Sequence, residues 1–274
     1  MGAQRTIGVI AGNGIYPEEF VAAARYREPE TRLAVAAFEG ETEGKLAEMV
    51  DSIEWFRVGQ LGKMIKWFRS EGALEAVMVG QIAPKNLFDL RPDLRTLMLL
   101  ARVRERNAES LFGAIGDELA KDGIELLPAT TFLEDHLASA GPVAGPRPGK
   151  RQLADIEFGF RIAKESSRLD IGQSVVVRHG TVLAVEAFEC TNACIRRGGE
   201  LGNGRDVTLV KVSKPEQDFR FDVPVIGPAT IATCAEAGVT MIAVEAGRTL
   251  VLGREELEAA CEQEKISVYG VEGE

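Results

Sequence analysis

The sequence contains few of the residues on which several common kinds of active site depend. Histidine occurs only twice, at His136 and His179, which excludes a histidine-rich binuclear metal site. The same scarcity disfavours Ser-His-Asp and Cys-His hydrolases, because neither histidine accompanies a nucleophile elbow. If this chain hydrolyses a substrate, water activated by a metal ion and carboxylates is therefore the simplest mechanism.

Cysteines and long apolar runs are also sparse. The four cysteines have neither the paired spacing of a zinc site nor the density of a disulfide scaffold. No run approaches the roughly 20 apolar residues that cross a bilayer. The chain also opens on an apolar run too short for a signal-peptide core. We therefore expect a cytoplasmic protein with reduced thiols, whose contact with a membrane is peripheral.

Positive charge is in deficit. Lysine and arginine number 32 against 42 aspartates and glutamates, which gives a formal net charge of -10 at pH 7. Nonspecific binding to nucleic acid requires an excess of cations that face the phosphates. We therefore expect no nucleic-acid partner, and any phosphate-binding site must be local.

The 274 residues are enough for two domains. In the first half, short apolar runs alternate with amphipathic segments, which is the pattern of βα units on a parallel sheet. Strands are expected at residues 6–11, 32–38, 53–58, 76–80 and 124–127, and helices at residues 18–25, 63–71, 93–104 and 109–121. The pattern predicts an α/β fold whose N-terminal domain, residues 1–135, is a Rossmann-like parallel sheet.

A stretch that disfavours regular structure divides the chain. Residues 139–150 contain three prolines and three glycines, so we predict a linker over residues 136–150. Beyond it we expect a helix at residues 152–167, a hairpin that turns at His179 and Gly180, strands at residues 207–212, 241–244, 249–252 and 266–269, and helices at residues 229–237 and 254–264. Residues 151–274 are therefore predicted to form a mixed α+β domain that carries the acidic motif described below.

A glycine loop follows the first expected strand. Gly12, Asn13 and Gly14 precede Pro17, which suits the first turn of a helix because proline lacks an N–H group. Backbone N–H groups in such a loop could hold a phosphate, although the glycines fit a tight strand-to-helix turn equally well. A nicotinamide-binding fingerprint needs a glycine where this chain has Pro17, although Glu39 could act as its ribose-binding acid.

The densest group of polar residues lies at residues 214–230, between a strand and a helix. It includes Lys214, Gln217, Asp218, Arg220 and Asp222. Mg²⁺ often binds through one or two carboxylates together with substrate phosphates, and the two aspartates fit that role. The alternative is a solvated loop in which the arginine pairs with one of the aspartates.

A weaker polar group lies at residues 186–197 and follows an expected strand. Thr191 or Asn192 could cap a helix there, which is the default explanation for such residues.

Four motifs, in this order, resemble the UDP-2,3-diacylglucosamine pyrophosphatase (LpxI) family of bacterial lipid A biosynthesis. They are the glycine loop, the strand end at residues 79–82, the turn at residues 189–192 and the block at residues 214–230. The most specific is Lys-Pro-x-Gln-Asp-x-Arg-x-Asp-x-Pro-x-Ile-Gly, and the resemblance covers essentially the whole chain. The family turn Glu-Gly-Thr-Asp reads Glu-Cys-Thr-Asn here, which suits Asn192 to a hydrogen bond with substrate rather than to a metal.

The resemblance implies Mg²⁺-dependent hydrolysis of UDP-2,3-diacylglucosamine to 2,3-diacylglucosamine 1-phosphate (lipid X) and UMP, with water attacking the β-phosphorus. It implies that Asp218 and Asp222 are the catalytic residues and hold the metal. The residues that it implies for substrate binding are Gly12, Asn13, Gly14, Gln81, Thr191, Asn192, Lys214, Gln217 and Arg220.

The same resemblance implies a lipid-linked nucleotide sugar as substrate, peripheral contact with the inner face of the inner membrane, and a homodimer. The acyl chains need an apolar enclosure, for which the candidates are Leu87, Phe88, Leu94, Leu97, Met98, Leu100 and Val103, although such a row more often belongs to a core. Two alternatives stay open. One is a nicotinamide-dependent oxidoreductase, and the other is a noncatalytic nucleotide-sugar or lipid-binding protein.

Overall fold

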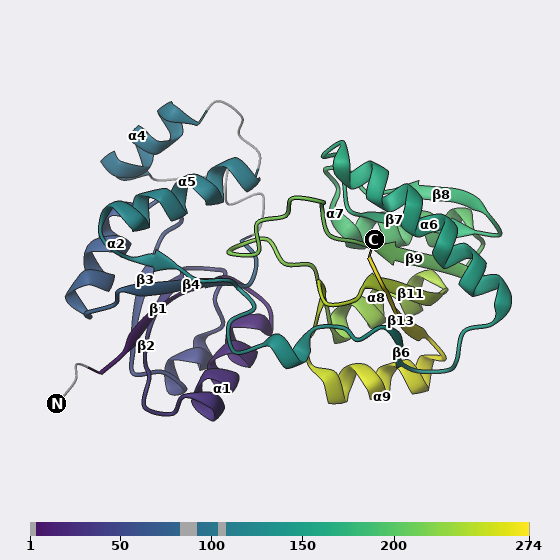
Figure 1. The fold of residues 1–274 in the computed structure, drawn as a ribbon, viewed down its shortest axis with the longest axis horizontal. Coiled ribbons are helices and arrows are strands. Elements are labelled where there is room, and N and C mark those ends of the chain that lie inside the picture. The colour runs from purple at the N-terminus through teal and green to yellow at the C-terminus, as the bar shows by residue number, and fades with distance from the viewer. Residues whose placement is uncertain (1–3, 83–91, 104–107, 274) are drawn as a thin grey trace. The chain divides into compact units, whose positions relative to one another are not determined.

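The computed structural model describes residues 4–82, 92–103 and 108–273, which fall into two compact units (Figure 1). Unit 1 comprises Met1–Glu134 together with Asp218–Asp222, and unit 2 comprises Asp135–Gln217 and Val223–Glu274. The division differs from the predicted domains, because the central part of the acidic motif belongs to unit 1 rather than to the C-terminal unit.

Unit 1 is built on a parallel sheet of five strands in the order β3-β2-β1-β4-β5. The strands are β1 (Thr6–Ala11), β2 (Arg32–Phe38), β3 (Ser52–Phe56), β4 (Glu75–Val79) and β5 (Glu125–Leu126). β1 is buried throughout its length and β2 over nearly all of it, as is usual for strands covered by helices on both faces. The predicted α/β fold with a parallel N-terminal sheet is confirmed.

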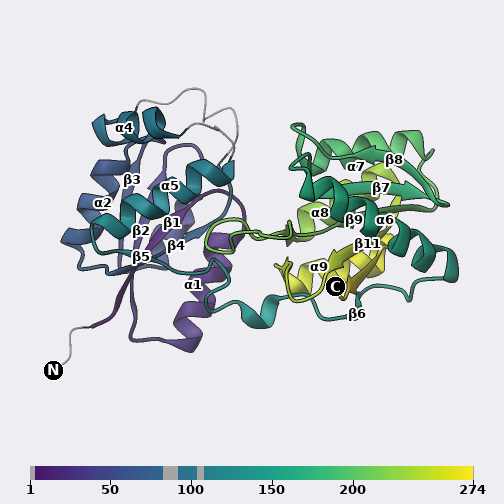
Figure 2. The ribbon, with the colours of Figure 1, turned by 45° about the horizontal axis from the view of Figure 1, so that its top comes forward.

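Helices cover both faces of this sheet (Figures 1 and 2). Helix α1 (Tyr16–Arg27) lies on one face, and α2 (Leu61–Ser70) and α5 (Ala108–Lys121) lie on the other. Helix α4 (Leu94–Arg102) packs against both α2 and α5. Buried Ile65, Phe68 and Leu119 from this layer form a core with the sheet. The structure also describes two short 3-10 helices, η1 (Gly44–Glu48) in unit 1 and η2 (Glu134–His136), where the chain passes from unit 1 to unit 2.

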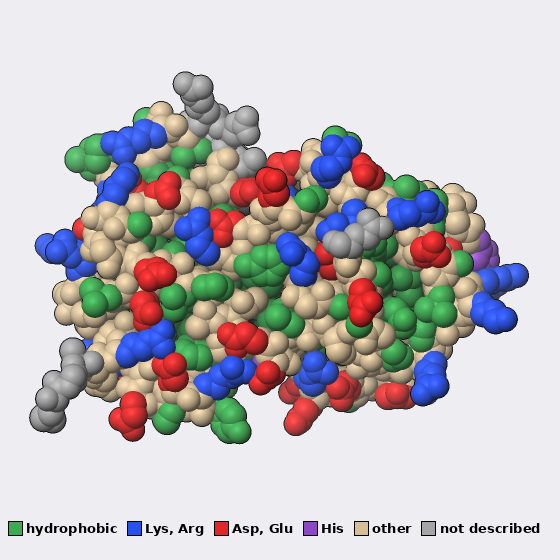
Figure 3. All heavy atoms as spheres, in the orientation of Figure 1, with side chains coloured by type: hydrophobic (Ala, Val, Ile, Leu, Met, Phe, Trp, Pro, Cys, Tyr) green, Lys and Arg blue, Asp and Glu red, His purple; other side chains and the backbone are tan. Residues whose placement is uncertain are grey.

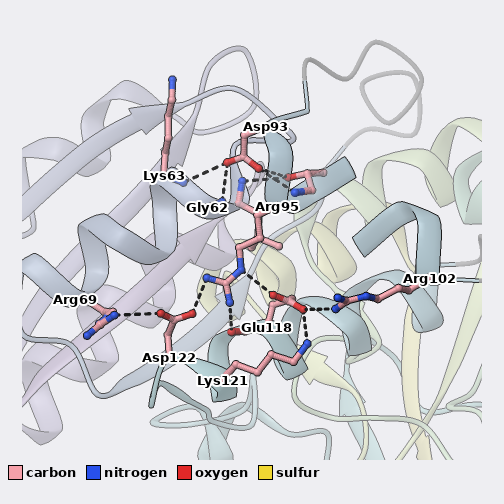
Figure 4. Close-up of polar contacts among 11 residues, drawn as sticks. Gly62, Lys63, Arg69, Asp93, Arg95, Arg102, Glu118, Lys121 and Asp122 are labelled. Carbon is pink, nitrogen blue, oxygen red and sulfur yellow. Dashed lines mark hydrogen bonds and ion pairs between the residues drawn. The ribbon is translucent and has the colours of Figure 1, made fainter. Parts of the chain in front are cut away.

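One carboxylate holds the start of two helices (Figure 4). Asp93 precedes α4, and its Oδ1 accepts a 2.9 Å hydrogen bond from the N–H of Thr96. Its Oδ2 accepts hydrogen bonds of 2.7 and 3.2 Å from the N–H groups of Gly62 and Lys63 in the first turn of α2. Because the first N–H groups of a helix have no partner within it, this carboxylate stabilises both helices and fixes α4 against α2.

Unit 2 contains a mixed sheet of six strands in the order β6-β13-β11-β9-β7-β8. These are β6 (Gly141–Ala144), β7 (Ser174–Arg178), β8 (Thr181–Val185), β9 (Val207–Lys211), β11 (Val239–Glu245) and β13 (Ser267–Val271). The central strands β13, β11 and β9 are parallel, whereas β6, β7 and β8 are antiparallel to their neighbours. Two short strands, β10 (Val225–Ile226) and β12 (Leu250–Val251), pair separately.

The helices of unit 2 pack through apolar side chains on both faces of its sheet. Helix α6 (Lys150–Arg168) covers one face, where Ile156 and Ala163 pack on Val210. Helices α7 (Cys190–Leu201), α8 (Pro228–Ala237) and α9 (Arg254–Glu264) cover the other. This arrangement agrees with the predicted mixed α+β domain. No helix in the described ranges is long and apolar enough to cross a membrane.

The hairpin predicted at His179 and Gly180 is confirmed. Both residues have positive φ angles, 48° and 72°, as a two-residue hairpin turn requires. The buried carboxylate of Asp155 accepts hydrogen bonds of 2.9 and 2.8 Å from their N–H groups, which ties the turn to α6.

Two local features differ from the sequence-based expectations. Part of the expected linker forms β6, where Pro142 is tolerated because an edge strand leaves one side of its backbone outside the ladder. Neither Thr191 nor Asn192 caps a helix, since α7 begins at Cys190 after the N-cap Glu189 and places both residues in its first turn.

Candidate active site

The glycine loop and Gln81 end the neighbouring strands β1 and β4. The N–H of Asn13 donates a 2.7 Å hydrogen bond to the carbonyl oxygen of Gln81, and the N–H of Gln81 donates a 3.3 Å hydrogen bond to the carbonyl oxygen of Asn13. A Cβ atom at Gly12 would lie 2.4 Å from the same carbonyl oxygen, so glycine is required for this approach. The two loops are therefore fixed to each other at the carboxyl edge of the sheet, where ligands bind in open α/β folds.

The other residues of this loop have different surroundings. Gly14 is exposed, has a φ angle of 85°, and has open space where a Cβ would stand. The Nδ2 of Asn13 donates a 2.7 Å hydrogen bond to the buried carboxylate of Glu41. Glu41 is therefore the acid that reaches the loop, whereas Glu39 forms a surface ion pair with Arg57 at 3.0 Å. This geometry gives no support to a nicotinamide site built on Glu39.

The segment Asp218–Asp222 packs on unit 1 at the end of β5. The N–H of Ala129, three residues after β5, donates a 2.8 Å hydrogen bond to the carbonyl oxygen of Phe219. The ring of Phe221 lies on that of Phe112 of α5, with 5.9 Å between the centroids. Backbone and aromatic contacts thus hold the acidic segment on unit 1.

Three candidate elements follow one another along a single edge of unit 1. β1, β4 and β5 are adjacent and parallel, so their carboxyl ends lie at the same edge. The glycine loop follows β1, Gln81 follows β4, and the segment Asp218–Asp222 is bound beyond β5. The segments at this edge therefore include the glycine loop, an amide residue, two aspartates and an arginine.

Asp218 and Arg220 form an ion pair within the segment. The Nε of Arg220 lies 3.0 and 3.1 Å from the two carboxylate oxygens of Asp218, and the Nη2 lies 2.7 Å from Oδ2. The hydrogen bond from Arg220 lowers the pKa of Asp218 and, reciprocally, raises the pKa of Arg220. Both groups are charged at neutral pH, which is the pairing that the sequence left open as an alternative.

This pairing bears on the predicted metal ligands. Both oxygens of Asp218 are engaged by Arg220, so this carboxylate would meet a metal ion as a member of an ion pair. Over the described part of the chain, no group of three or more histidine, cysteine or acidic side chains is arranged to hold a metal. Mg²⁺ needs only one or two carboxylates when phosphates supply further oxygens. The residues therefore fit an ion held jointly with a diphosphate, and not a cage formed by protein alone.

Lys214 and Gln217 lie in unit 2 and are bonded to each other. The N–H of Lys214 donates a 2.6 Å hydrogen bond to the Oε1 of Gln217, and its ammonium pairs with Asp170. Gln217 is only 7% exposed, and its Nε2 has no hydrogen-bond partner among the described atoms. Leaving a buried donor unsatisfied is costly, so this amide is a strong candidate to bind a ligand oxygen.

The remaining predicted residues also lie in unit 2. The hydroxyl of Thr191 donates a 2.7 Å hydrogen bond to the buried carboxylate of Glu186, while Asn192 is exposed in the first turn of α7. A Cβ at Gly172 would lie 2.2 Å from the carbonyl oxygen of Glu186. One short turn, residues 170–172, therefore lies near both predicted residues. Its Gly172 packs against Glu186, the partner of Thr191, and its Asp170 pairs with Lys214.

Sequence reasoning missed a buried polar network at the carboxyl ends of β9 and β11. Glu245, 3% exposed, accepts hydrogen bonds of 2.8 and 2.7 Å from the N–H and hydroxyl of Ser213 and of 3.1 Å from Lys164. The Nε of Arg248 also donates to the hydroxyl of Ser213 at 2.5 Å. The network fixes the residue directly before Lys214, and its members are too dispersed in sequence to form a motif.

An apolar cavity of about 90 Å³ lies in unit 1 between the sheet and helices α2, α4 and α5. Ile10 and Ile82, near the ends of β1 and β4, contribute to its wall, as does Leu100 of α4. Of the predicted acyl-chain residues, Leu100 lines the cavity and Val103 packs against the same core, while Leu94, Leu97 and Met98 are exposed. Leu87 and Phe88 lie outside the described residues.

Comparisons with known proteins cover nearly the whole chain. Residues 6–136 match the family model of the LpxI N-terminal domain, and residues 139–269 match that of the LpxI C-terminal domain. A Caulobacter vibrioides protein named UDP-2,3-diacylglucosamine pyrophosphatase LpxI is 33% identical over 278 residues, which cover 98% of each chain. A solved biotin carboxylase domain of the Hydrogenobacter thermophilus 2-oxoglutarate carboxylase shows 16% identity and a TM-score of 0.28 over 65% of this chain and 35% of its own. The latter similarity is too low to carry an argument.

Proposed function

The chain belongs to the LpxI family, and we propose that it hydrolyses UDP-2,3-diacylglucosamine to 2,3-diacylglucosamine 1-phosphate and UMP in lipid A synthesis. The relative named for this activity aligns with nearly the entire chain. The observation that carries the proposal is the arrangement along the carboxyl edge of unit 1, where the glycine loop, Gln81 and the segment Asp218–Asp222 follow one another. Such an edge can bind a diphosphate and act on it.

Arg220 is suited to the charge that develops during hydrolysis. A guanidinium carries five N–H donors in a rigid fork, more than the carboxylate of Asp218 can accept. The ion pair orients the group before substrate arrives, and the other donors can then bind phosphate oxygens. Preoriented donors of this kind stabilise a transition state without reorganisation. Asp218 thus acts in the proposal chiefly by positioning Arg220.

We assign Asp222 the central catalytic role and the main contact with Mg²⁺, with Asp218 beside it. The bound ion would offset the charge of the diphosphate and acidify a water molecule. Water adds to the β-phosphorus, the bond from that phosphorus to the bridging oxygen breaks, and one proton is released. The bridging oxygen leaves with UMP.

The remaining assignments are those that the family resemblance implies. Gly12, Asn13, Gly14 and Gln81 are proposed to contact substrate from unit 1. Considered by itself, unit 2 offers Thr191, Asn192, Lys214 and Gln217, of which the buried Nε2 of Gln217 is the best supported. The apolar cavity lined by α2, α4 and α5 is proposed to accept part of an acyl chain, since its wall is almost wholly hydrocarbon. A homodimer at the inner face of the inner membrane also remains a proposal.

Isotope labelling tests both the activity and the position of attack. The protein is incubated with UDP-2,3-diacylglucosamine, detergent and Mg²⁺ in ¹⁸O-labelled water, and the products are weighed by mass spectrometry. We expect UMP without label and a sugar 1-phosphate with one ¹⁸O atom. Label in UMP would contradict attack at the β-phosphorus. Quantitative recovery of intact substrate would favour the noncatalytic binding protein.

A further inference from the structure

Helix α4 has an apolar face that points away from the protein. Leu94, Leu97 and Met98 are 72%, 50% and 47% exposed, although they lie within two turns of one helix. The opposite face carries buried Leu99 and the cavity-lining Leu100. A helix on the surface of a domain normally has one apolar stripe, directed to the core. The second stripe is therefore unexplained by the fold, and clustered exposed apolar side chains mark binding surfaces.

The surroundings of this stripe are cationic, in contrast to the net charge of -10 of the whole chain. Helix α4 contains Arg95 and Arg102, helix α2 beside it contains Lys63, Lys66 and Arg69, and neither helix contains an acidic residue. Figure 3 shows hydrophobic and cationic side chains next to each other over α4. The lysines of α2 are exposed.

The acidic groups next to this surface are engaged. Asp93 accepts hydrogen bonds from backbone N–H groups of α2 and α4, and Asp122 binds Arg95 and Arg69 at 2.5 and 3.2 Å. Glu118 of α5 binds Arg95, Lys121 and Arg102 at 2.7, 2.5 and 3.6 Å (Figure 4). Its side chain is buried, whereas the side chains of Arg102 and Lys121 are largely exposed. A partner that approaches the outer face of α4 therefore meets exposed hydrocarbon together with the exposed side chains of Arg102, Lys121 and the lysines of α2.

We propose that the outer face of α4, with the cations of α2, docks on the surface of an anionic lipid bilayer. Interfacial helices insert apolar side chains among the acyl chains while lysine and arginine contact lipid phosphates. A second copy of the same face fits less well, because a two-fold contact would bring like charges together. The choice of a bilayer also rests on the proposed substrate, whose two acyl chains place it in a membrane. Docking there would present α4 and the cavity beneath it to the lipid.

Vesicle binding tests the proposal without any turnover, so that its failure is distinguishable from failure of the proposed function. Full-length protein is sedimented with vesicles of phosphatidylcholine alone or of phosphatidylcholine with phosphatidylglycerol. We expect binding to the anionic vesicles, weakened at high salt. The variant Leu94→Ser/Leu97→Ser should bind at least tenfold more weakly. The variant Lys63→Gln/Lys66→Gln should bind about thirtyfold more weakly, at roughly 1 kcal/mol per cation.

The matched control is Leu169→Ser/Leu201→Ser, which removes two leucines of unit 2 that are 59% and 58% exposed. It should bind vesicles as the unaltered protein does. Thermal unfolding of each variant verifies folding, and the single variant Leu97→Ser serves if the double variant is unstable. The proposal is overturned if the protein does not bind anionic vesicles, or if the α4 variant and the α2 variant both bind them as the unaltered protein does. It is also overturned if the α4 variant dissociates a dimer while vesicle binding persists, because a second copy then covers this face.

Discussion

The hydroxyl of Tyr16 donates a buried hydrogen bond of 2.6 Å to the carbonyl oxygen of Ala129. Tyr16 begins the helix that follows the glycine loop, and the N–H of Ala129 donates to the carbonyl oxygen of Phe219 in the acidic segment. One residue after β5 thus contacts both the helix that follows the glycine loop and the acidic segment. These hydrogen bonds hold the two parts together without a ligand.

Removal of this hydroxyl should weaken the connection. Tyr16→Phe leaves a buried carbonyl oxygen without its partner, which should cost about 1–3 kcal/mol of unfolding free energy. Burial raises the pKa of Tyr16, so its contribution is complete below the unfolded value of about 10 and is lost as pH rises above it. Denaturant unfolding as a function of pH measures both effects. Tyr26→Phe alters a tyrosine that is 89% exposed, so it should change neither the unfolding free energy nor its dependence on pH. Equal unfolding free energies for the two variants would contradict the role of Tyr16.

Changes at the two aspartates should have different consequences. Asp222→Ala should lower kcat at least about 100-fold, in the range typical for loss of a catalytic group, while thermal stability and the Mg²⁺-independent part of product binding persist. It should also abolish the Mg²⁺-dependent part of UMP binding, which calorimetry measures without turnover. Glu216→Gln alters an exposed carboxylate of the same loop and should leave both unchanged. A near-normal kcat for Asp222→Ala would move the chemistry elsewhere.

Asp218→Ala should act through Arg220 rather than through the metal. Loss of the carboxylate removes the hydrogen bonds that orient the guanidinium, so both kcat and KM should worsen severely. Arg220→Lys should reproduce much of this defect, because an ammonium cannot form the same bidentate contact. Mg²⁺-dependent UMP binding should survive in both variants. If Asp218→Ala lost it as completely as Asp222→Ala, Asp218 would be a direct ligand.

The cavity assignment predicts a dependence on acyl length. Leu100→Trp places a larger side chain in the wall of the cavity and should raise KM for the natural diacyl substrate. The effect should be small for an analogue that carries acetyl groups, because nothing then needs to enter the cavity. Leu97→Trp is the matched control on the outer face of the same helix. Equal effects on both substrates would show that the acyl chains bind elsewhere.

Asp93 should contribute to stability in a pH-dependent manner. Partial burial acts against ionisation, but the hydrogen bonds from Thr96, Lys63 and Gly62 prevail and lower the pKa of Asp93. The contribution is therefore complete above the unfolded value of about 4 and is lost as pH falls through the lower folded value. At pH 7, Asp93→Ala should cost about 1–2 kcal/mol as the loss of a helix cap, and Asp93→Asn less. The difference between Asp93→Ala and the unaltered protein should shrink below pH 4, and a constant difference would contradict this origin.

The sequence predicted regular elements well where local pattern and tertiary packing agree. The buried runs that became β1 and β2 and the turn at His179 are examples, because periodicity and turn chemistry are local properties. The proline and glycine residues of β6 led instead to the prediction of a linker. An edge strand tolerates these residues, but the composition of a segment does not show that it will lie at the edge of a sheet.

Helix α7 shows a further limit of local reasoning. Gly198 and Gly199 lower helix propensity, yet a Cβ at Gly198 would lie 2.5 Å from the Cβ of Val176, and one at Gly199 would lie 2.1 Å from the carbonyl oxygen of Ala237. Close packing requires both glycines, and only the fold reveals it. For similar reasons, the sequence predicted which residues belong to the candidate site but not how they are arranged. The motif identified Asp218 and Arg220 and left their pairing open as an alternative, but the contact of their segment with α5 depends on distant parts of the chain.

The membership of Asp218–Asp222 in unit 1 has a consequence for the order in which the protein can be completed during synthesis. A nascent chain that has emerged as far as Glu134 already contains every strand of the first sheet. It still lacks the ring of Phe221, which lies on Phe112, and the carbonyl group of Phe219, which accepts a hydrogen bond from Ala129. The ribosome must add more than eighty further residues before that surface is covered. The N-terminal unit therefore begins first but is finished only after most of the C-terminal unit has been made.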